Sequence, residues 1–201
     1  MKLLSGLFAL VLLLLSGCAY TKMQIATQQD LGPAAPGKAQ IVFLRSSFVE
    51  SAGQASVYDV TSGNPFFIGI VANNTKVRHQ TDPGKRTFMV ISEAADFMQA
   101  ELVAGRTYYS IITPRMEAQK ARYFSLWPIK KDPASEFSTA SEEFAGWLAN
   151  TKLVENTPQS EQWARDNNKD VQEKYHEYWT QWLGKTLEEK EQLTLRPDDG
   201  E

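Results

Sequence analysis

Short runs of apolar and β-branched residues, separated by turn-forming residues, follow one another from residue 40 to about residue 127. In several runs apolar and polar positions alternate, which gives a strand one buried and one wetter face. No long helical pattern separates the runs, so they predict an antiparallel β-sandwich or barrel of about seven or eight strands. The clearest expected strands are 40–45, 55–60, 65–71, 86–91, 98–102, 107–113 and 122–127.

Two turn sequences indicate how neighbouring strands connect. Asn73 and Asn74 lie between apolar runs, as in a tight hairpin, because Asn tolerates positive φ. Pro83 presets the first corner of a second turn, and Gly84 supplies the positive φ of a type II turn. This second turn is expected to join two antiparallel strands.

After residue 131 the pattern becomes helical, which predicts an α+β fold with a C-terminal helical extension over 132–201. Thr139 with Glu142, and Asp170 with Glu173, have capping-box spacing, and Pro158 after Thr157 is a further helix start. An aromatic stripe then recurs at three- and four-residue intervals, on one helix face. Either it packs on the sandwich, or part of it is an exposed docking surface for a protein or a membrane. Its aromatic residues are Tyr175, Tyr178, Trp179 and Trp182.

The N-terminal region has the organisation of an export signal. Lys2 precedes nine apolar residues at 7–15, far fewer than the roughly 18 that cross a bilayer. The next residues complete the sequence LSGC at 15–18, which resembles the lipobox of bacterial lipoproteins. That resemblance implies cleavage before Cys18 and attachment of acyl chains such as palmitate to its sulfur. The alternative is an unlipidated signal peptide, 1–17, followed by a chance cysteine.

Residues 18–39 are small, polar and rich in Pro and Gly, and they predict a lipidated tether. A flexible coil of about 20 residues spans roughly 25 Å, enough to hold the domain off a membrane. The alternative is that Tyr20, Met23 and Ile25 dock on the domain. By analogy with enterobacterial lipoproteins, Ala19 in place of Asp favours the outer membrane, with the domain facing the periplasm.

Composition excludes some partners and supports a folded core. The formal net charge of −3 and the lack of a basic stripe argue against nucleic acid binding. Since Cys18 is the only cysteine, no disulfide is expected within the mature domain, and its stability must come from an apolar core. Hydrophobic residues make up 42% of the chain, which is sufficient for such a core.

Four segments between residues 40 and 127 carry a second resemblance. They read IVFLR at 41–45, IGIVANNT at 68–75, TDPGKRTF at 81–88 and LVAGRTYY at 102–109. This order is similar to a family of small bacterial envelope lipoproteins with a domain of unknown function. The resemblance implies a transthyretin-like or immunoglobulin-like β-sandwich in residues 40–131 and no established reaction. The C-terminal third lies outside it.

Motifs that carry chemistry are missing from the sequence. We find no nucleophile elbow, no HExxH pair and no P-loop, and His79 and His176 are too isolated for a conventional zinc site. The segment 166–177 places oxygen ligands at EF-hand positions. Val171, however, stands where the calcium loop needs glycine, and Asp170 is better explained as a helix cap. The expectation is a protein that is not an enzyme and uses no metal or cofactor.

Four cations form a candidate binding set. Lys76 and Arg78 alternate on one expected strand, and Lys85 and Arg86 follow the next turn. If the two strands pair, the cations gather near one sheet edge. There they either bind anionic saccharide or lipid headgroups, or protect the edge from aggregation.

The sequence thus predicts a lipid-anchored envelope protein acting as a non-catalytic interaction or scaffold module. Its expected partners are the membrane, through Cys18, and an envelope protein, through the C-terminal helix. One alternative is a lipid- or saccharide-binding lipoprotein with a cavity between sandwich and helix. A less favoured one is an envelope hydrolase or transferase accessory using two of Asp59, Asp96 and Glu101.

Overall fold

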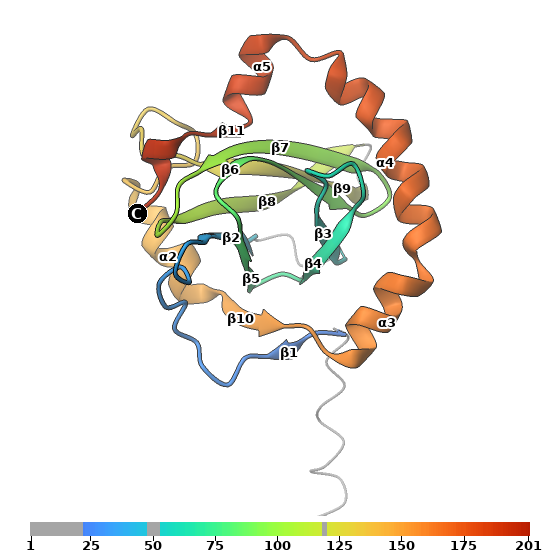
Figure 1. Cartoon of the computed structure of the whole chain (residues 1–201), viewed down its shortest axis with the longest axis horizontal. Coiled ribbons are helices and arrows are strands. Elements are labelled where there is room, and N and C mark those ends of the chain that lie inside the picture. The colour runs from blue at the N-terminus through green and yellow to red at the C-terminus, as the bar shows by residue number, and fades with distance from the viewer. Residues whose placement is uncertain (1–21, 48–52, 118–119) are drawn as a thin grey trace, which may run out of the picture.

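The structure, a computed structural model, describes residues 22–47, 53–117 and 120–201. It has an α+β fold in which strands form two sheets and helices flank them (Figure 1). The strands are β1 (Gln24–Ile25), β2 (Ala39–Arg45), β3 (Ala55–Asp59), β4 (Phe66–Val71), β5 (Thr75–Thr81), β6 (Gly84–Ile91), β7 (Ala95–Leu102), β8 (Thr107–Glu117), β9 (Lys120–Ile129), β10 (Lys152–Glu155) and β11 (Thr194–Leu195). The helices are α2 (Glu142–Asn150), α3 (Pro158–Asp166), α4 (Asn168–Leu183), α5 (Leu187–Gln192) and the 3-10 turn η2 (Pro197–Asp199).

Both sheets are mixed, so the prediction of a purely antiparallel sandwich is wrong. The first sheet has the order β1-β10-β5-β2-β8-β9, and the second has the order β11-β7-β6-β3-β4. The pairs β2 with β8, β10 with β5 and β11 with β7 are parallel. The prediction failed because each parallel pair joins segments far apart in the chain, and local alternation carries no information on such pairing.

The two predicted turns form, but they connect different sheets. Asn74 has φ of 57° and Gly84 has φ of 108°. The first turn leads from β4 in the second sheet to β5 in the first, and the second turn leads back to β6. Neither turn can form a hairpin with β5, because β5 is already hydrogen-bonded to β10 on one side and to β2 on the other. The chain therefore crosses the core twice within about 20 residues.

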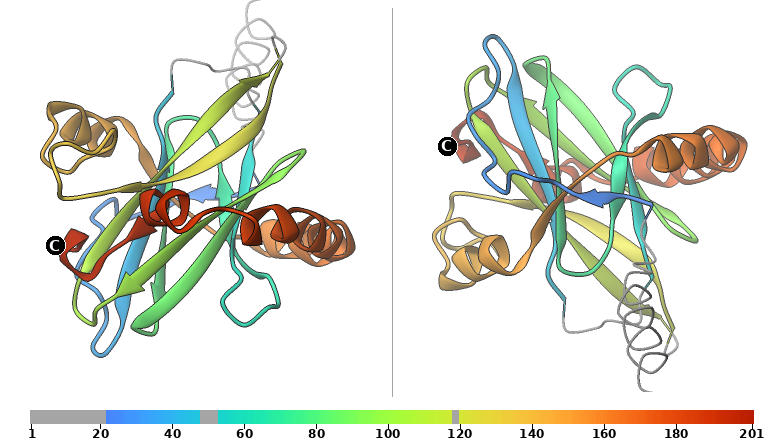
Figure 2. Two further views of the ribbon diagram at one scale, coloured as in Figure 1. Left: turned by 90° about the horizontal axis from the view of Figure 1, so that it is seen from above. Right: turned by 90° about the horizontal axis from the view of Figure 1, so that it is seen from below.

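One apolar core fills the space between the sheets, and two smaller clusters lie on their outer faces. The central cluster takes side chains from both sheets, including Phe43 of β2 and Phe88 of β6, whose rings meet edge to face at 5.1 Å. On the outer face of the first sheet Phe144 of α2 packs on Tyr109. Helix α4 packs on the outer face of the second sheet, so α2 and α4 lie on opposite sides of the molecule (Figure 2).

Residues after 131 are not purely helical, which corrects the expected helical extension. They supply β10 to the first sheet and β11 to the second. Of the predicted helix starts, Thr157 caps α3 with Pro158 behind it. Ser141 rather than Thr139 caps α2, because the Ser141 hydroxyl accepts the hydrogen bond from the Phe144 amide. Asp170 lies in the first turn of α4, which follows Asn167.

The described part of the predicted tether, residues 22–39, lies on the domain and is not a free coil. Strand β1 pairs with β10, and Met23 is buried against Gly69, where a Cβ would approach its Cε to 3.0 Å. The Gln29 amide donates to Leu153 O and accepts from Leu153 N. Of the three residues proposed to dock, Met23 is buried, Ile25 is 67% exposed, and Tyr20 lies outside the described residues.

Candidate functional site

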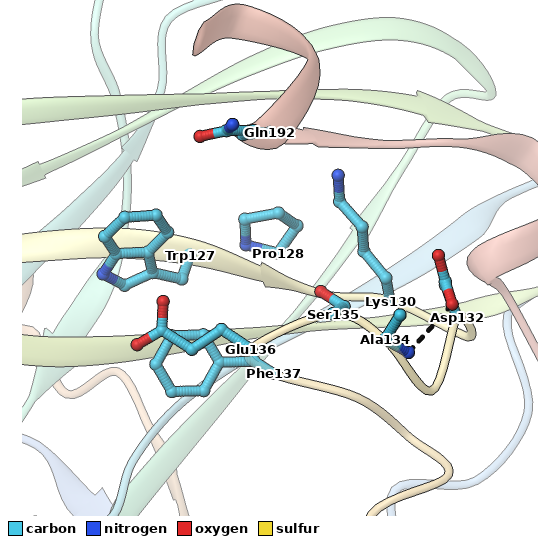
Figure 3. Close-up of a pocket in the computed structure, with 9 residues that line it drawn as sticks. All are labelled: Trp127, Pro128, Lys130, Asp132, Ala134, Ser135, Glu136, Phe137 and Gln192. Atoms are coloured by element: carbon cyan, nitrogen blue, oxygen red, sulfur yellow. Dashed lines mark hydrogen bonds between the residues drawn. The ribbon is translucent and has the colours of Figure 1, made fainter. Parts of the chain in front are cut away.

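The candidate site lies where the end of β9, the loop 130–138 and the C-terminal end of α5 meet (Figure 3). Trp127 enters from β9, and its ring nitrogen donates to Thr113 Oγ1 on β8 at 3.1 Å. The loop is closed at its base by backbone hydrogen bonds from Lys130 to Phe137 and from Thr139 to Lys130. At the loop tip the Ala134 amide donates to the Asp132 carboxylate at 2.9 Å. These bonds give the loop a fixed shape.

Two hollows adjoin along this loop. One has a volume of about 350 Å³ and the other about 490 Å³. Both are lined by Trp127, Glu136 and Phe137, so they are neighbouring parts of one groove. Figure 3 shows these three side chains together at one end, Lys130 and Asp132 at the other, and Gln192 of α5 opposite.

Two of the charged groups in the groove form an ion pair, and a third is bound to the backbone. Arg115 Nη2 lies 2.8 Å from Asp96 Oδ2, and Arg115 Nε donates to the Ser125 hydroxyl. Asp96 also accepts from the Leu126 amide on the outer edge of β9, which links the two sheets. Lys130 donates to Glu191 O at 2.8 Å, and burial lowers the pKa of this lysine. The arrangement favours a fixed polar wall over a reactive centre.

A third hollow, of about 570 Å³, lies beside α2 and is lined by Trp147. Phe137, which lines the groove, lies between the two tryptophans, because the centre of its ring is 6.0 Å from that of Trp127 and 5.9 Å from that of Trp147. All three rings are half-buried. Three aromatic side chains therefore lie in a row, with a hollow along each part of it.

The three carboxylates proposed for an enzyme have different surroundings. Asp59 Oδ2 is 3.9 Å from His79 Nε2, and Asp59 Oδ1 accepts from the Thr61 amide. Asp96 pairs with Arg115, and Glu101 is exposed. Asp96 lines the hollow of about 490 Å³, together with Arg115.

Three of the four candidate cations have separate partners, and the expected shared edge does not exist. Lys76 is buried and donates to Leu148 O and Thr151 O at the end of α2, at 2.7 and 2.9 Å. Arg78 donates to Leu31 O. On β6, Arg86 donates to Asp82 O, and Lys85 is exposed. The prediction failed because β5 is an interior strand and β6 belongs to the other sheet.

The aromatic stripe of α4 faces the second sheet. Tyr175 and Trp182 are buried, while Tyr178 and Trp179 are half-buried. Phe97 of β7 lies within 6.1 Å of three of the stripe's rings. Burial raises the pKa of the Tyr175 hydroxyl. These contacts match the packing interpretation of the stripe, and Leu183 at its end is 58% exposed.

Two further sequence features concern metals and the anchor. The EF-hand-like segment 166–177 is helical over most of its length, and Asp170 pairs with Lys174 at 3.0 Å. Across the described ranges no three His, Cys, Asp or Glu side chains form a group that could hold a metal ion. Cys18 lies outside the described residues.

The row of Trp127, Phe137 and Trp147 was not singled out from the sequence as a site. These residues lie in a strand, a loop and a helix, and they belong to no common period. The ten-residue spacing between them has no meaning in a helix or a strand, so no local signal joins them. Half-burial of three neighbouring aromatic rings is a property of the tertiary structure alone.

Comparisons with protein-family models, with curated proteins and with solved structures find no match to this chain. Its assignment therefore depends on its own residues and geometry.

Proposed function

We propose that this protein is a bacterial envelope lipoprotein, anchored by acyl chains on Cys18, whose folded part is a non-catalytic interaction module. The LSGC sequence at 15–18, after nine apolar residues, is the observation that carries the proposal. Each buried methylene contributes about 0.8 kcal/mol, so two or three acyl chains give lasting attachment. No helix in the described part of the chain is long and apolar enough to span a bilayer.

The site geometry supports binding over catalysis. The buried carboxylate of the groove, Asp96, is neutralised by Arg115, which disfavours its use as a nucleophile or general base. The hollows along the row of Trp127, Phe137 and Trp147 are open and mixed in polarity, which suits a partner or ligand. The motif resemblance to small envelope lipoproteins agrees with this proposal.

The anchor would hold the domain close to the membrane. Lys22 is already fixed to the domain, because its carbonyl accepts from the Thr157 hydroxyl at 2.6 Å. Residues 19–21 alone separate Cys18 from Lys22, and a fully extended chain over four steps reaches about 14 Å. The face around β1 and α3 would therefore lie next to the lipid headgroups, with the α5 side pointing away (Figure 1).

The test is metabolic labelling with a palmitate analogue, followed by membrane fractionation. We expect the wild-type chain to be labelled and to sediment with membranes. Cys18→Ser removes the only thiol that can be acylated, so label and sedimentation should both be lost. Ser16→Ala keeps a small residue in the box and serves as the matched control. A labelled Cys18→Ser chain in the membrane fraction would contradict the anchor.

A further inference from the structure

The row of Trp127, Phe137 and Trp147, here named the aromatic ladder, runs from β9 across the loop 130–138 to α2. Successive rings are tilted by 42° and 57° at about the same spacing. Each ring is half-buried, so one part packs on the outer face of the first sheet and another part remains accessible. A structural core would bury all three, whereas a ladder next to three hollows offers stacking surface to a ligand.

The hollow beside Trp147 carries polar groups that the protein does not use. In the described ranges, the side chains of Asn74, Glu143 and Asn150 and the ring nitrogen of Trp147 form no hydrogen bond or ion pair. The part of the wall formed by Ser47 and Asn73 is fixed, because the Asn73 side chain accepts from Ser47 N at 3.0 Å and donates to Ser47 O at 2.9 Å. The hollow thus combines a fixed part of its wall with several free donors and acceptors, in contrast to the paired Asp96 and Arg115 of the groove.

Gly146 supports a role for this hollow outside folding. It lies in the middle of α2, where glycine is less favourable than alanine by about 0.5–1 kcal/mol. A Cβ built on Gly146 would meet no atom within 4 Å, so packing does not require the glycine. The same residue lines the hollow beside Trp147. The bare backbone therefore leaves room for another molecule at a cost to helix stability.

The lining identifies the ligand class. Among the described residues that line it, Glu143 carries the charge and none is a cation, which disfavours phosphate and acidic headgroups. Free amide and carboxylate groups beside an indole suit sugar hydroxyl and acetamido groups, with the apolar face of a pyranose on the ring. We propose that the aromatic ladder and the Trp147 hollow bind an uncharged glycan chain of N-acetylated hexose units. This inference does not depend on the lipid anchor.

The experiment is calorimetric titration of the full-length protein, in detergent, with chitohexaose, a linear hexamer of N-acetylglucosamine. We expect saturable heat, together with a shift of the intrinsic tryptophan fluorescence. Trp147→Ala should weaken binding by roughly tenfold or more, the loss of one well-packed aromatic contact. Trp179→Phe, which changes a ring packed on Phe97 away from the ladder, should bind as the wild type does.

Gly146→Ala separates a binding role from a structural one. The new methyl group should raise the unfolding temperature or leave it unchanged, because it improves helix propensity in open space. It should nevertheless weaken chitohexaose binding by roughly tenfold, because it occupies the bare helix surface. Absence of saturable heat with the wild type, or unchanged affinity in both Trp147→Ala and Gly146→Ala, would overturn the proposal. So would binding of anionic lipid vesicles at Trp147 without any response to the hexamer.

Discussion

Asp59 and His79 face each other across the core, one from each sheet. Both side chains are largely buried, and Asp59 also accepts from the Thr61 amide at 2.8 Å. Burial alone would raise the pKa of Asp59, but the His79 imidazole and the Thr61 bonds outweigh it, so the pKa lies below its usual value. The ionised form of Asp59 therefore stabilises the folded state.

The sign of this effect predicts a pH dependence. A carboxyl group with a lowered pKa adds stability above its unfolded pKa, near 3.9, and loses it as pH falls through the folded value. Asp59→Asn should lower the free energy of unfolding by about 1 kcal/mol at pH 7, with the difference from wild type shrinking below about pH 4. Urea unfolding of the wild type and of Asp59→Asn at several pH values measures this difference.

The matched control is Glu101→Gln on β7, which changes an exposed carboxylate. It should shift the free energy of unfolding by no more than about 0.5 kcal/mol at any of these pH values. An Asp59→Asn effect that stays constant down to pH 2 would show that ionisation of Asp59 plays no part.

Helix α4 is held to the second sheet by its aromatic stripe. Trp182 is 2% exposed and packs on Phe97 of β7 at a ring distance of 6.0 Å. Trp182→Ala should lower the free energy of unfolding by about 3–5 kcal/mol, because it opens a cavity between helix and sheet. Thermal and chemical unfolding followed by circular dichroism would measure this loss.

Leu183→Ala is the control for α4, because the neighbouring Leu183 side chain is 58% exposed and should contribute little. If both variants are equally stable, the stripe does not hold the helix. A docking surface for a partner would then be the better interpretation of the stripe.

The elements that the sequence predicted are those with a local pattern. Seven of the strands contain or closely match the predicted runs, because period-two alternation is a property of neighbouring residues. Strands β1, β10 and β11 have two to four residues and exist only because distant strands offer them an edge. The same limit explains why the two turns were located correctly but were predicted to join strands that do not pair. Strand order depends on contacts that no local window contains.

At the scale of the whole molecule, the candidate site lies where segments from both halves of the chain meet. Trp127 ends a predicted strand, whereas Phe137 and Trp147 belong to the segment expected to be a separate helical extension. The local pattern around each aromatic residue indicates its element but not which other rings lie beside it. The same holds for a charged side chain that the sequence predicts to be available for binding. Lys76 is instead bound to Leu148 O of α2, and this contact exists only in the packed structure.

The C-terminal segment 194–201 connects the two sheets, and its removal should destabilise the entire fold. Strand β11 extends β7 in the second sheet, and Leu195 is fully buried in the central core. Beyond it, Thr107 at the start of β8 exchanges two backbone hydrogen bonds with Glu201. The Asp199 carboxylate also accepts from the Lys131 amide at 2.9 Å, which fixes one end of the loop 130–138.

A chain ending at Leu193 should therefore lose at least about 3 kcal/mol of unfolding free energy, the cost of removing a buried leucine alone. Because the loop 130–138 carries Phe137, chitohexaose binding should weaken with it. Arg196→Ala, which removes an exposed side chain near Glu191 and keeps the backbone, is the control and should be neutral. Urea unfolding of the wild type, the shortened chain and Arg196→Ala measures the three free energies of unfolding. An unchanged midpoint in the shortened chain would mean that the two sheets are held together without this segment.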